Sequence, residues 1–262
     1  MPWDVYTDDV KSSVAQYGDA AIVTLSRVGG EGADLSYGEV NYLALDDNEK
    51  SMLENLASMK KNGEIKSIIV LINSANALQV DFLKNNDYDV DAALWIGDVG
   101  ISGINAVAEI LTGKVNPSGS LVDTYCYDNF SAPAMWNFTP TTYEGYVEGG
   151  DVPAKSKSYM IYQEGIYVGY KYYETRYFDT VMNQGNAAST VGSSTGSAWN
   201  YDDEVTYPFG YGLSYTTFTQ TLDDLNVDLD NETVTAKVTV TNTGSVAGKD
   251  VVQLYVSLPY TD

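Results

Sequence analysis

The sequence predicts an α/β protein, with a mostly parallel sheet sandwiched by helices, followed by the beginning of an all-β sandwich. Two observations predict this order. Short continuous apolar runs alternate with helix-period segments in the first half of the chain, which is typical of a parallel sheet covered on both faces. Near the end of the chain, apolar and polar residues alternate with the period of two that marks half-buried strands.

The first half contains start and stop signals for each expected element. Asp46 and Glu49 form a capping-box pattern, and apolar residues recur after them at helical spacing up to Gly63. In chain order, we expect a helix at residues 7–17, a strand at 19–25, a helix at 46–63, strands at 67–72 and 90–96, and a helix at 104–111. In parallel sheets of this kind, ligands bind beyond the carboxyl ends of the strands.

The second half has a different pattern. Residues 159–179 are rich in aromatic side chains, and residues 183–200 form a loop rich in Gly, Ser, Ala and Asn. The alternation at residues 234–240 and again at 250–258 predicts two strands of a sandwich. Because a sandwich needs about seven strands, we expect the chain to be an excerpt of a longer protein.

Composition excludes several classes of function. The chain has no histidine and a single cysteine, Cys126, which excludes Ser-His-Asp triads, zinc sites built from His and Cys, and an internal disulfide. The net charge of −22 argues against binding nucleic acid, and no apolar run is long enough for a membrane helix. The compartment stays open, although one free cysteine slightly favours the cytoplasm over secretion.

Two ligand-binding motifs are incomplete. After Gly30 and Gly32, a dinucleotide fingerprint requires glycine where this chain has Leu35. Asp87, Asp89 and Asp91 resemble the start of a calcium loop, but Ala92 stands where that loop requires glycine. We therefore expect neither a metal nor a cofactor.

The stretch "SRVGGEGADL" places one carboxylate, Glu31, among glycines directly after the strand expected at residues 19–25. With no histidine in the chain, paired carboxylates become the leading catalytic chemistry. Glycines would let the loop reach a partner without side-chain clash. The alternative is that Glu31 is a solvated turn residue before a helix.

Four motifs occur in a recognisable order. They are "GISGINAVAEILTGKVNPSGSLVDT" at residues 100–124, "YQEGIYVGYKYYETRYFD" at 162–179, "YPFGYGLSYTTF" at 207–218, and "VTNTGSVAGKDVVQLYVSLPY" at 240–260. In this order they resemble glycoside hydrolase family 3, the β-glucosidase and β-xylosidase family. The resemblance implies an α/β sandwich domain at residues 1–218, truncated at its start, and the beginning of a fibronectin-III-like domain at 219–262.

The resemblance also implies a mechanism. The family's general acid/base glutamate lies in a context similar to "GEG-x-D", which Glu31 and Asp34 match here, although Leu35 stands where many members have Arg. The nucleophilic Asp of the family lies on a separate (β/α)8 barrel, which this sequence lacks. The implied protein is a retaining β-glycosidase acting on β-glucosides or β-xylosides, and this chain alone is expected to be inactive.

Other charged residues have candidate roles in binding or in structure. Arg27 and Asp34 are candidates for substrate binding, with surface pairing and loop stabilisation as their alternative roles. Glu164, Lys171 and Arg176 are expected to form a structural charge cluster. Two rival functions remain open: a non-catalytic carbohydrate-binding or assembly module that uses tyrosine faces, and a flavodoxin-like cofactor domain.

Overall fold

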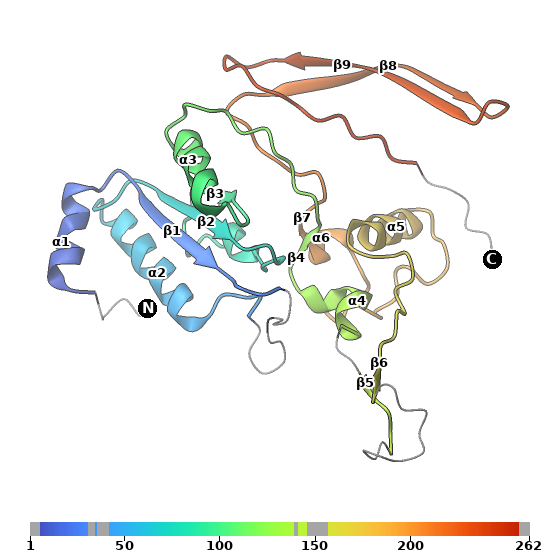
Figure 1. Ribbon diagram of the computed structural model, residues 1–262, viewed down its shortest axis with the longest axis horizontal. Helices are drawn as coiled ribbons and strands as arrows, with labels where there is room; N and C mark the ends of the chain where they lie inside the picture. The colour runs from blue at the N-terminus through green and yellow to red at the C-terminus, as the bar shows by residue number, and fades with distance from the viewer. Residues whose placement is uncertain (1–5, 31–34, 36–41, 139–140, 146–156, 257–262) are drawn as a thin grey trace. The chain divides into compact units, whose positions relative to one another are not determined.

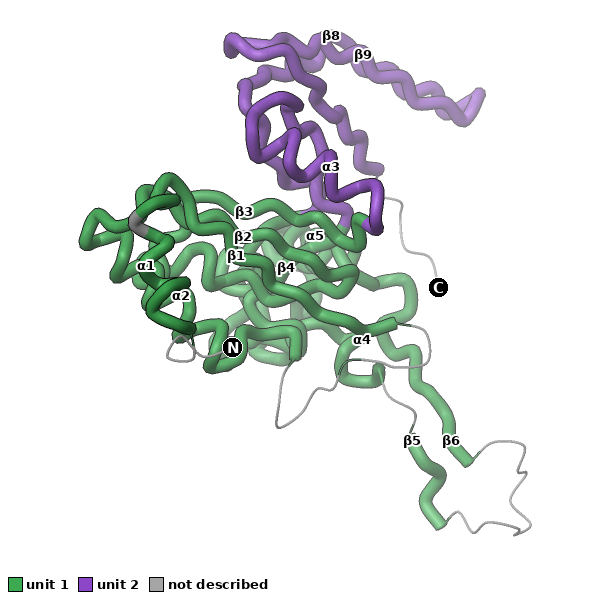
Figure 2. Tube along the Cα trace, turned by 60° about the vertical axis from the view of Figure 1, so that its left-hand side comes forward, with its two compact units in different colours: residues 1–99, 123–208 green, residues 100–122, 209–262 purple. Residues whose placement is uncertain are grey.

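The computed structural model describes residues 6–30, 35, 42–138, 141–145 and 157–256 of the chain (Figure 1). They divide into two compact units, of which the first combines residues 1–99 with 123–208 and the second combines residues 100–122 with 209–262 (Figure 2). None of the helices in these ranges is long and apolar enough to cross a membrane.

The first unit contains a parallel sheet of three strands. Its strands are β1 (Ala21–Ser26), β2 (Ile68–Asn73) and β3 (Ala92–Trp95), in the order β1-β2-β3. All three run in the same direction, so their carboxyl ends lie at one edge of the sheet. The central strand β2 is mostly buried, whereas β1 alternates between buried and more exposed side chains. The α/β prediction is confirmed.

Two helices precede β1 and β2 (Figure 1). Helix α1 (Asp8–Gln16) matches the helix predicted at residues 7–17. Helix α2 (Asp47–Lys61) begins with the predicted capping box, in which the Asp46 side chain and the Glu49 side chain each accept a backbone N–H. Its buried residues, Leu53 and Leu56, belong to the apolar set that predicted the helix. Because α2 joins the end of β1 to the start of β2, it runs back from the carboxyl edge to the amino edge.

The rest of the first unit contains helix α5 and several shorter elements. In chain order they are η2 (Asp81–Lys84), β4 (Tyr125–Cys126), η3 (Asn129–Ser131), α4 (Pro133–Trp136), β5 (Thr141–Thr142), β6 (Ser158–Tyr159), α5 (Tyr170–Val181), α6 (Tyr201–Glu204) and β7 (Val205–Tyr207). β4 pairs with β7, and β5 pairs with β6, both antiparallel. The aromatic-rich segment therefore contains a helix, α5, which begins directly after Gly169, whose φ of 58° suits glycine.

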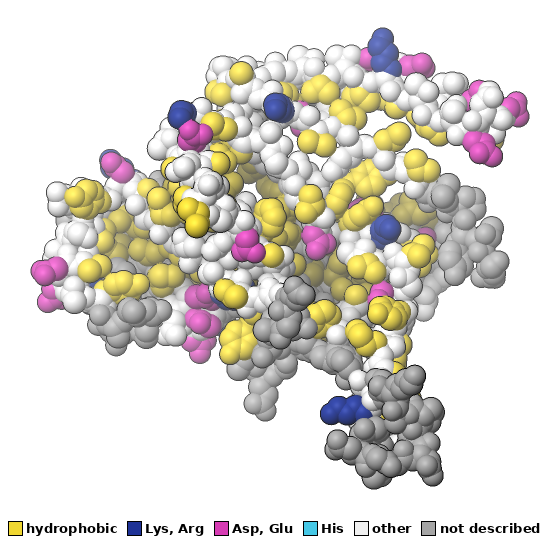
Figure 3. Space-filling view, in the orientation of Figure 1, with side chains coloured by type: hydrophobic (Ala, Val, Ile, Leu, Met, Phe, Trp, Pro, Cys, Tyr) yellow, Lys and Arg dark blue, Asp and Glu magenta, His cyan; other side chains and the backbone are white. Residues whose placement is uncertain are grey.

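The second unit contains helix α3 (Gly100–Leu111) and a long antiparallel hairpin of β8 (Phe218–Asp228) and β9 (Thr233–Asn242). Asn116 links three segments within this unit: its amide donates to the carbonyl of Ala247 (3.0 Å) and accepts from Ser214 Oγ and Tyr215 N (both 2.8 Å). Exposed apolar side chains line the hairpin, among them Leu222, Leu225, Val227, Val234 and Val240 (Figure 3).

One strand prediction was wrong within the described residues. β9 confirms the strand predicted at residues 234–240, but residues 250–256 form no strand. A strand requires a ladder of backbone hydrogen bonds, whereas Gln220 reaches this segment through its side chain, at Val251 O (3.0 Å) and Asp250 Oδ2 (2.8 Å). The fibronectin-III-like assignment and the boundary between residues 218 and 219 stay predictions.

Candidate functional site

The carboxyl edge of the sheet is lined by small polar side chains from neighbouring strands. Ser26 ends β1 and donates from Oγ to Asn73 Oδ1 at the end of β2 (3.4 Å). Asn73 in turn donates from Nδ2 to the carbonyl of Gly97, which follows β3. Trp95, the last residue of β3, donates from Nε1 to Ser74 O (2.9 Å). These bonds tie the ends of the three strands together at the edge where parallel sheets bind ligands.

Glu31 and Asp34, the predicted acid/base and its neighbour, lie outside the described residues. The described residues that flank them, Gly29 and Leu35, lie against each other. A Cβ added to Gly29 would stand 2.7 Å from Leu35 Cγ and 3.4 Å from Asn76 Oδ1, so a larger residue at this position would displace its neighbours. Gly29 and Leu35 therefore lie side by side, on either side of residues 31–34.

Arg27, the first residue after β1, has a nearly buried side chain that is 9% exposed. Its Nη1 and Nη2 donate to the two carboxylate oxygens of Glu49, each at 2.7 Å. The remaining N–H groups donate to carbonyls of Ser26 (2.9 Å), Ala44 (2.9 Å) and Tyr42. All five donors of the guanidinium are thus used, and none is free for a sugar hydroxyl.

Glu49 makes two kinds of contact from one carboxylate. It is the third residue of α2, and its Oε2 accepts the backbone N–H of Asp46 (2.9 Å) while the Asp46 side chain accepts the N–H of Glu49 (2.8 Å). The same carboxylate, which is 16% exposed, also forms the bidentate pair with Arg27. The sequence indicated the capping box, but it carried no signal for the partner 22 residues earlier.

At the other edge of the sheet, a lysine occupies the place of the cation that the acidic motif suggested. Lys60 Nζ, near the end of α2, lies 2.8 Å from Asp91 Oδ1 and 3.1 Å from Asp89 Oδ2, and donates to the carbonyl of Asp89 (2.9 Å). Asp91 also accepts the N–H of Ile68 at the start of β2 (2.8 Å). Within the described ranges, no group of three or more His, Cys, Asp or Glu is arranged to hold a metal ion.

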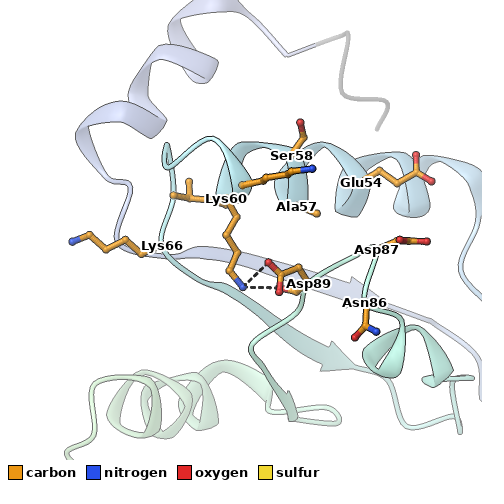
Figure 4. Close-up of a pocket in the computed structure, with 10 residues that line it drawn as sticks. Glu54, Ala57, Ser58, Lys60, Lys66, Asn86, Asp87 and Asp89 are labelled. Atoms are coloured by element: carbon orange, nitrogen blue, oxygen red, sulfur yellow. Dashed lines mark hydrogen bonds and ion pairs between the residues drawn. The ribbon is translucent and has the colours of Figure 1, made fainter.

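An open groove lies along this same amino edge (Figure 4). It is lined by Glu54, Ala57, Ser58, Lys60, Lys61, Ile65, Lys66, Asn86, Asp87 and Asp89. Lys60 points across it toward Asp89, so the most buried charge of the groove is already paired (Figure 4). The groove is therefore at the edge opposite to the segment of Glu31, and its chemistry is structural.

The predicted cluster of Glu164, Lys171 and Arg176 is not formed. Among the described residues no ion pair joins the three. Lys171 and Arg176 both lie on α5, five residues apart, which places them about 140° apart around the helix axis. Arg176 instead donates to the carbonyls of Ala187 (2.8 Å) and Ser189 (3.0 Å), and so fixes the loop that follows α5.

The sequence carried no signal for a buried polar cluster at α5. The hydroxyls of Ser131 and Tyr173 are 2.7 Å apart, and Cys126 packs beside Tyr173 in the same core. Burial raises the pKa of the Cys126 thiol to about 11, so the thiol stays protonated at neutral pH. The thiolate is the nucleophilic form, and this cysteine is therefore a core residue and not a reactive one.

Comparison with known proteins gives a consistent result. Residues 6–170 match the glycosyl hydrolase family 3 C-terminal domain. The chain is 32% identical to a β-glucosidase from Ruminococcus albus, and the match covers 99% of the chain and 22% of that protein. It is 33% identical to β-glucosidase A from Butyrivibrio fibrisolvens, and this match covers 96% of the chain and 29% of that protein. It also resembles the crystal structure of a β-glucosidase from Paenibacillus barengoltzii, with a TM-score of 0.65, 27% identity, and coverage of 94% of this chain and 22% of that one. The chain thus spans less than a third of the length of these relatives.

Proposed function

Because the chain belongs to glycoside hydrolase family 3, through the C-terminal domain of that family, we propose that it is part of a retaining β-glycosidase and that Glu31 is the general acid/base. The observation that carries the proposal is that the family match spans the "GGEGAD" segment, which begins three residues after the end of β1. The carboxyl end of a parallel strand is where this class of fold places its ligands.

The chemistry requires two carboxylates. In the first step, the nucleophilic carboxylate attacks the anomeric carbon while the acid, Glu31, donates its proton to the departing glycosidic oxygen. In the second step, the Glu31 carboxylate takes a proton from water, and that water hydrolyses the glycosyl–enzyme ester and releases the nucleophile. Because the chain has no histidine, a carboxyl group is the available side chain for this acid/base role at neutral pH.

The nucleophile is proposed to lie outside this chain, on the (β/α)8 barrel of the parent enzyme. The chain covers 22% and 29% of two β-glucosidases that it resembles, which leaves room in such proteins for a barrel. The relatives favour β-glucosides as substrates, with β-xylosides as the alternative. Since Glu31 alone cannot form the covalent intermediate, the isolated chain is expected to have no normal hydrolytic turnover.

The domain organisation is part of the same proposal. Residues 1–218 would form the α/β sandwich domain, and residues 219–262 would begin a fibronectin-III-like domain. The β8–β9 hairpin supports the second assignment, because it carries apolar side chains along its strands and an isolated hairpin is marginally stable without further strands or a covering layer.

The test is made on the full-length parent enzyme with Glu31→Gln and Glu31→Ala. Loss of the acid should lower kcat/KM on phenyl β-glucoside by about 10²–10⁴-fold, while an activated dinitrophenyl glucoside, which leaves without protonation, should be affected far less. With Glu31→Ala, azide should restore turnover and give the β-glucosyl azide, because azide attacks the glycosyl enzyme without needing a base.

A matched control is Glu54→Gln, which changes an exposed glutamate on α2 and should leave both substrates unaffected. If Glu31→Gln retains normal turnover of the phenyl glucoside, Glu31 is not the acid. The carbohydrate-binding hypothesis would then become the stronger one, provided that the isolated chain binds sugar.

A further inference from the structure

Arg27 connects the two ends of a longer stretch of chain, residues 28–41, which contains Glu31. The residue itself stands at the beginning of that segment, directly after β1. Its guanidinium bonds to Tyr42 O, to Ala44 O and to Glu49, which lie 15, 17 and 22 residues later, at the far end of the segment and on the first turn of α2. One side chain therefore closes the base of the loop.

The hydrogen bonds between Arg27 and Glu49 restrict the movement of both side chains. Two parallel N–H···O bonds to a carboxylate fix both the distance and the plane of the two groups. Glu49 cannot follow a shifted Arg27 freely, because its Oε2 also caps α2 through the N–H of Asp46. Leu43 adds a further anchor nearby, since its carbonyl accepts the N–H of Gln79 (2.6 Å).

Proton donation to a leaving oxygen depends steeply on where the acid stands, since a misplacement of about 1 Å can cost about 10²-fold in rate. We infer that Arg27 and Glu49 form a positioning pair for the general acid, holding both ends of its loop at the carboxyl edge of the sheet. The inference rests on the proposed function of Glu31. It assigns the pair no contact with substrate, since every N–H donor of Arg27 is already used.

Two conservative variants of the parent enzyme release the pair with little change in side-chain size. Arg27→Lys keeps the positive charge, but one ammonium cannot replace the fork to Glu49 and the bonds to three carbonyls. Glu49→Gln keeps a residue that serves in a capping box, but it turns one carboxylate oxygen into an N–H₂ group that faces the guanidinium. Either variant suffices for the test if the other fails to fold.

The readout is the dependence of kcat/KM on the leaving group, measured with dinitrophenyl, nitrophenyl and phenyl β-glucosides. In both variants, kcat/KM on the phenyl glucoside should fall by about 10- to 100-fold, and on the dinitrophenyl glucoside by about threefold or less. A purely structural role would lower the amount of folded enzyme and so reduce all three rates by one factor. Folded variants with the wild-type ratio of rates would overturn the inference.

The matched control is Lys60→Met, which breaks the ion pairs at the opposite end of α2. It should leave the ratio of rates unchanged, and an equal change in this variant would contradict the inference by showing a general loosening of the domain.

Glu31→Gln separates the two proposals. If it alters the ratio and the Arg27 and Glu49 variants do not, only the positioning role fails; if it leaves the ratio unchanged, the proposed function itself fails.

Discussion

The two ends of helix α2 are both held by ion pairs, but the two pairs differ in geometry and in contact with water. At the carboxyl edge, Arg27 and Glu49 are 9% and 16% exposed and meet in a bidentate fork. At the amino edge, Lys60 is 15% exposed, whereas its partners Asp91 and Asp89 are 41% and 57% exposed.

This difference determines what happens when one partner is removed. Glu49 without Arg27 would remain a nearly buried carboxylate with no cation beside it, and breaking a pair of this kind is strongly destabilising. Asp91 and Asp89 without Lys60 can be hydrated where they stand. Of the two pairs, the one at the carboxyl edge should therefore matter more for stability, besides its proposed effect on catalysis.

The largest effect is expected from Arg27→Met. The free energy of unfolding should fall by about 3–5 kcal/mol, because Glu49 loses its cation and the carbonyls of Tyr42 and Ala44 lose their donor. Urea unfolding measures the change.

A double-mutant cycle makes the comparison sharper. Arg27→Met combined with Glu49→Met should be more stable than the single Arg27→Met variant, since no charge is then left unpaired. If the free energy of unfolding of the double variant falls by the sum of the decreases in the two single variants, the pair has no coupling energy. The contrast between the two ends of α2 then disappears.

A smaller effect is expected from Lys60→Met. The free energy of unfolding should fall by about 1–2 kcal/mol, because the lost charge-assisted bonds to Asp91 and Asp89 are partly replaced by water. The same urea experiment measures it. A loss as large as that of Arg27→Met would contradict the argument from exposure.

The sequence predicted the parts of this fold that follow from local pattern. Helix α2 and its capping box were predicted because apolar periodicity and the pair of Asp46 and Glu49 are readable within a few residues. The parallel strands were predicted because buried strands of this kind form continuous apolar runs, as β2 does. The order of the four family motifs carried the rest of the assignment.

What the sequence did not predict depends on contacts between distant residues. The pairing of Arg27 with Glu49 bridges 22 residues, and that of Lys60 with Asp91 bridges 31. The three aspartates resembled a calcium loop because the local sequence does not show that the Lys60 ammonium pairs with two of them, Asp89 and Asp91. The alternation at residues 250–258 indicated a strand, although the described part of it, residues 250–256, has no backbone ladder.

The smallest predicted effect is a pH dependence of the stability that Asp91 contributes at the amino edge of the sheet. Burial raises the pKa of Asp91, but the hydrogen bonds from Lys60 and from the N–H of Ile68 outweigh it, so the pKa lies below its usual 3.8. A carboxyl group whose pKa is lowered on folding stabilises the folded state above its unfolded pKa, and this contribution is lost as the pH falls through the folded value. The difference in melting temperature between wild type and Asp91→Asn should therefore be constant from about pH 5 to pH 9 and should shrink below about pH 4. Thermal melts across this range measure the difference. If the difference in melting temperature were undiminished at pH values well below 3.8, the charge of Asp91 would not be what stabilises this end of α2.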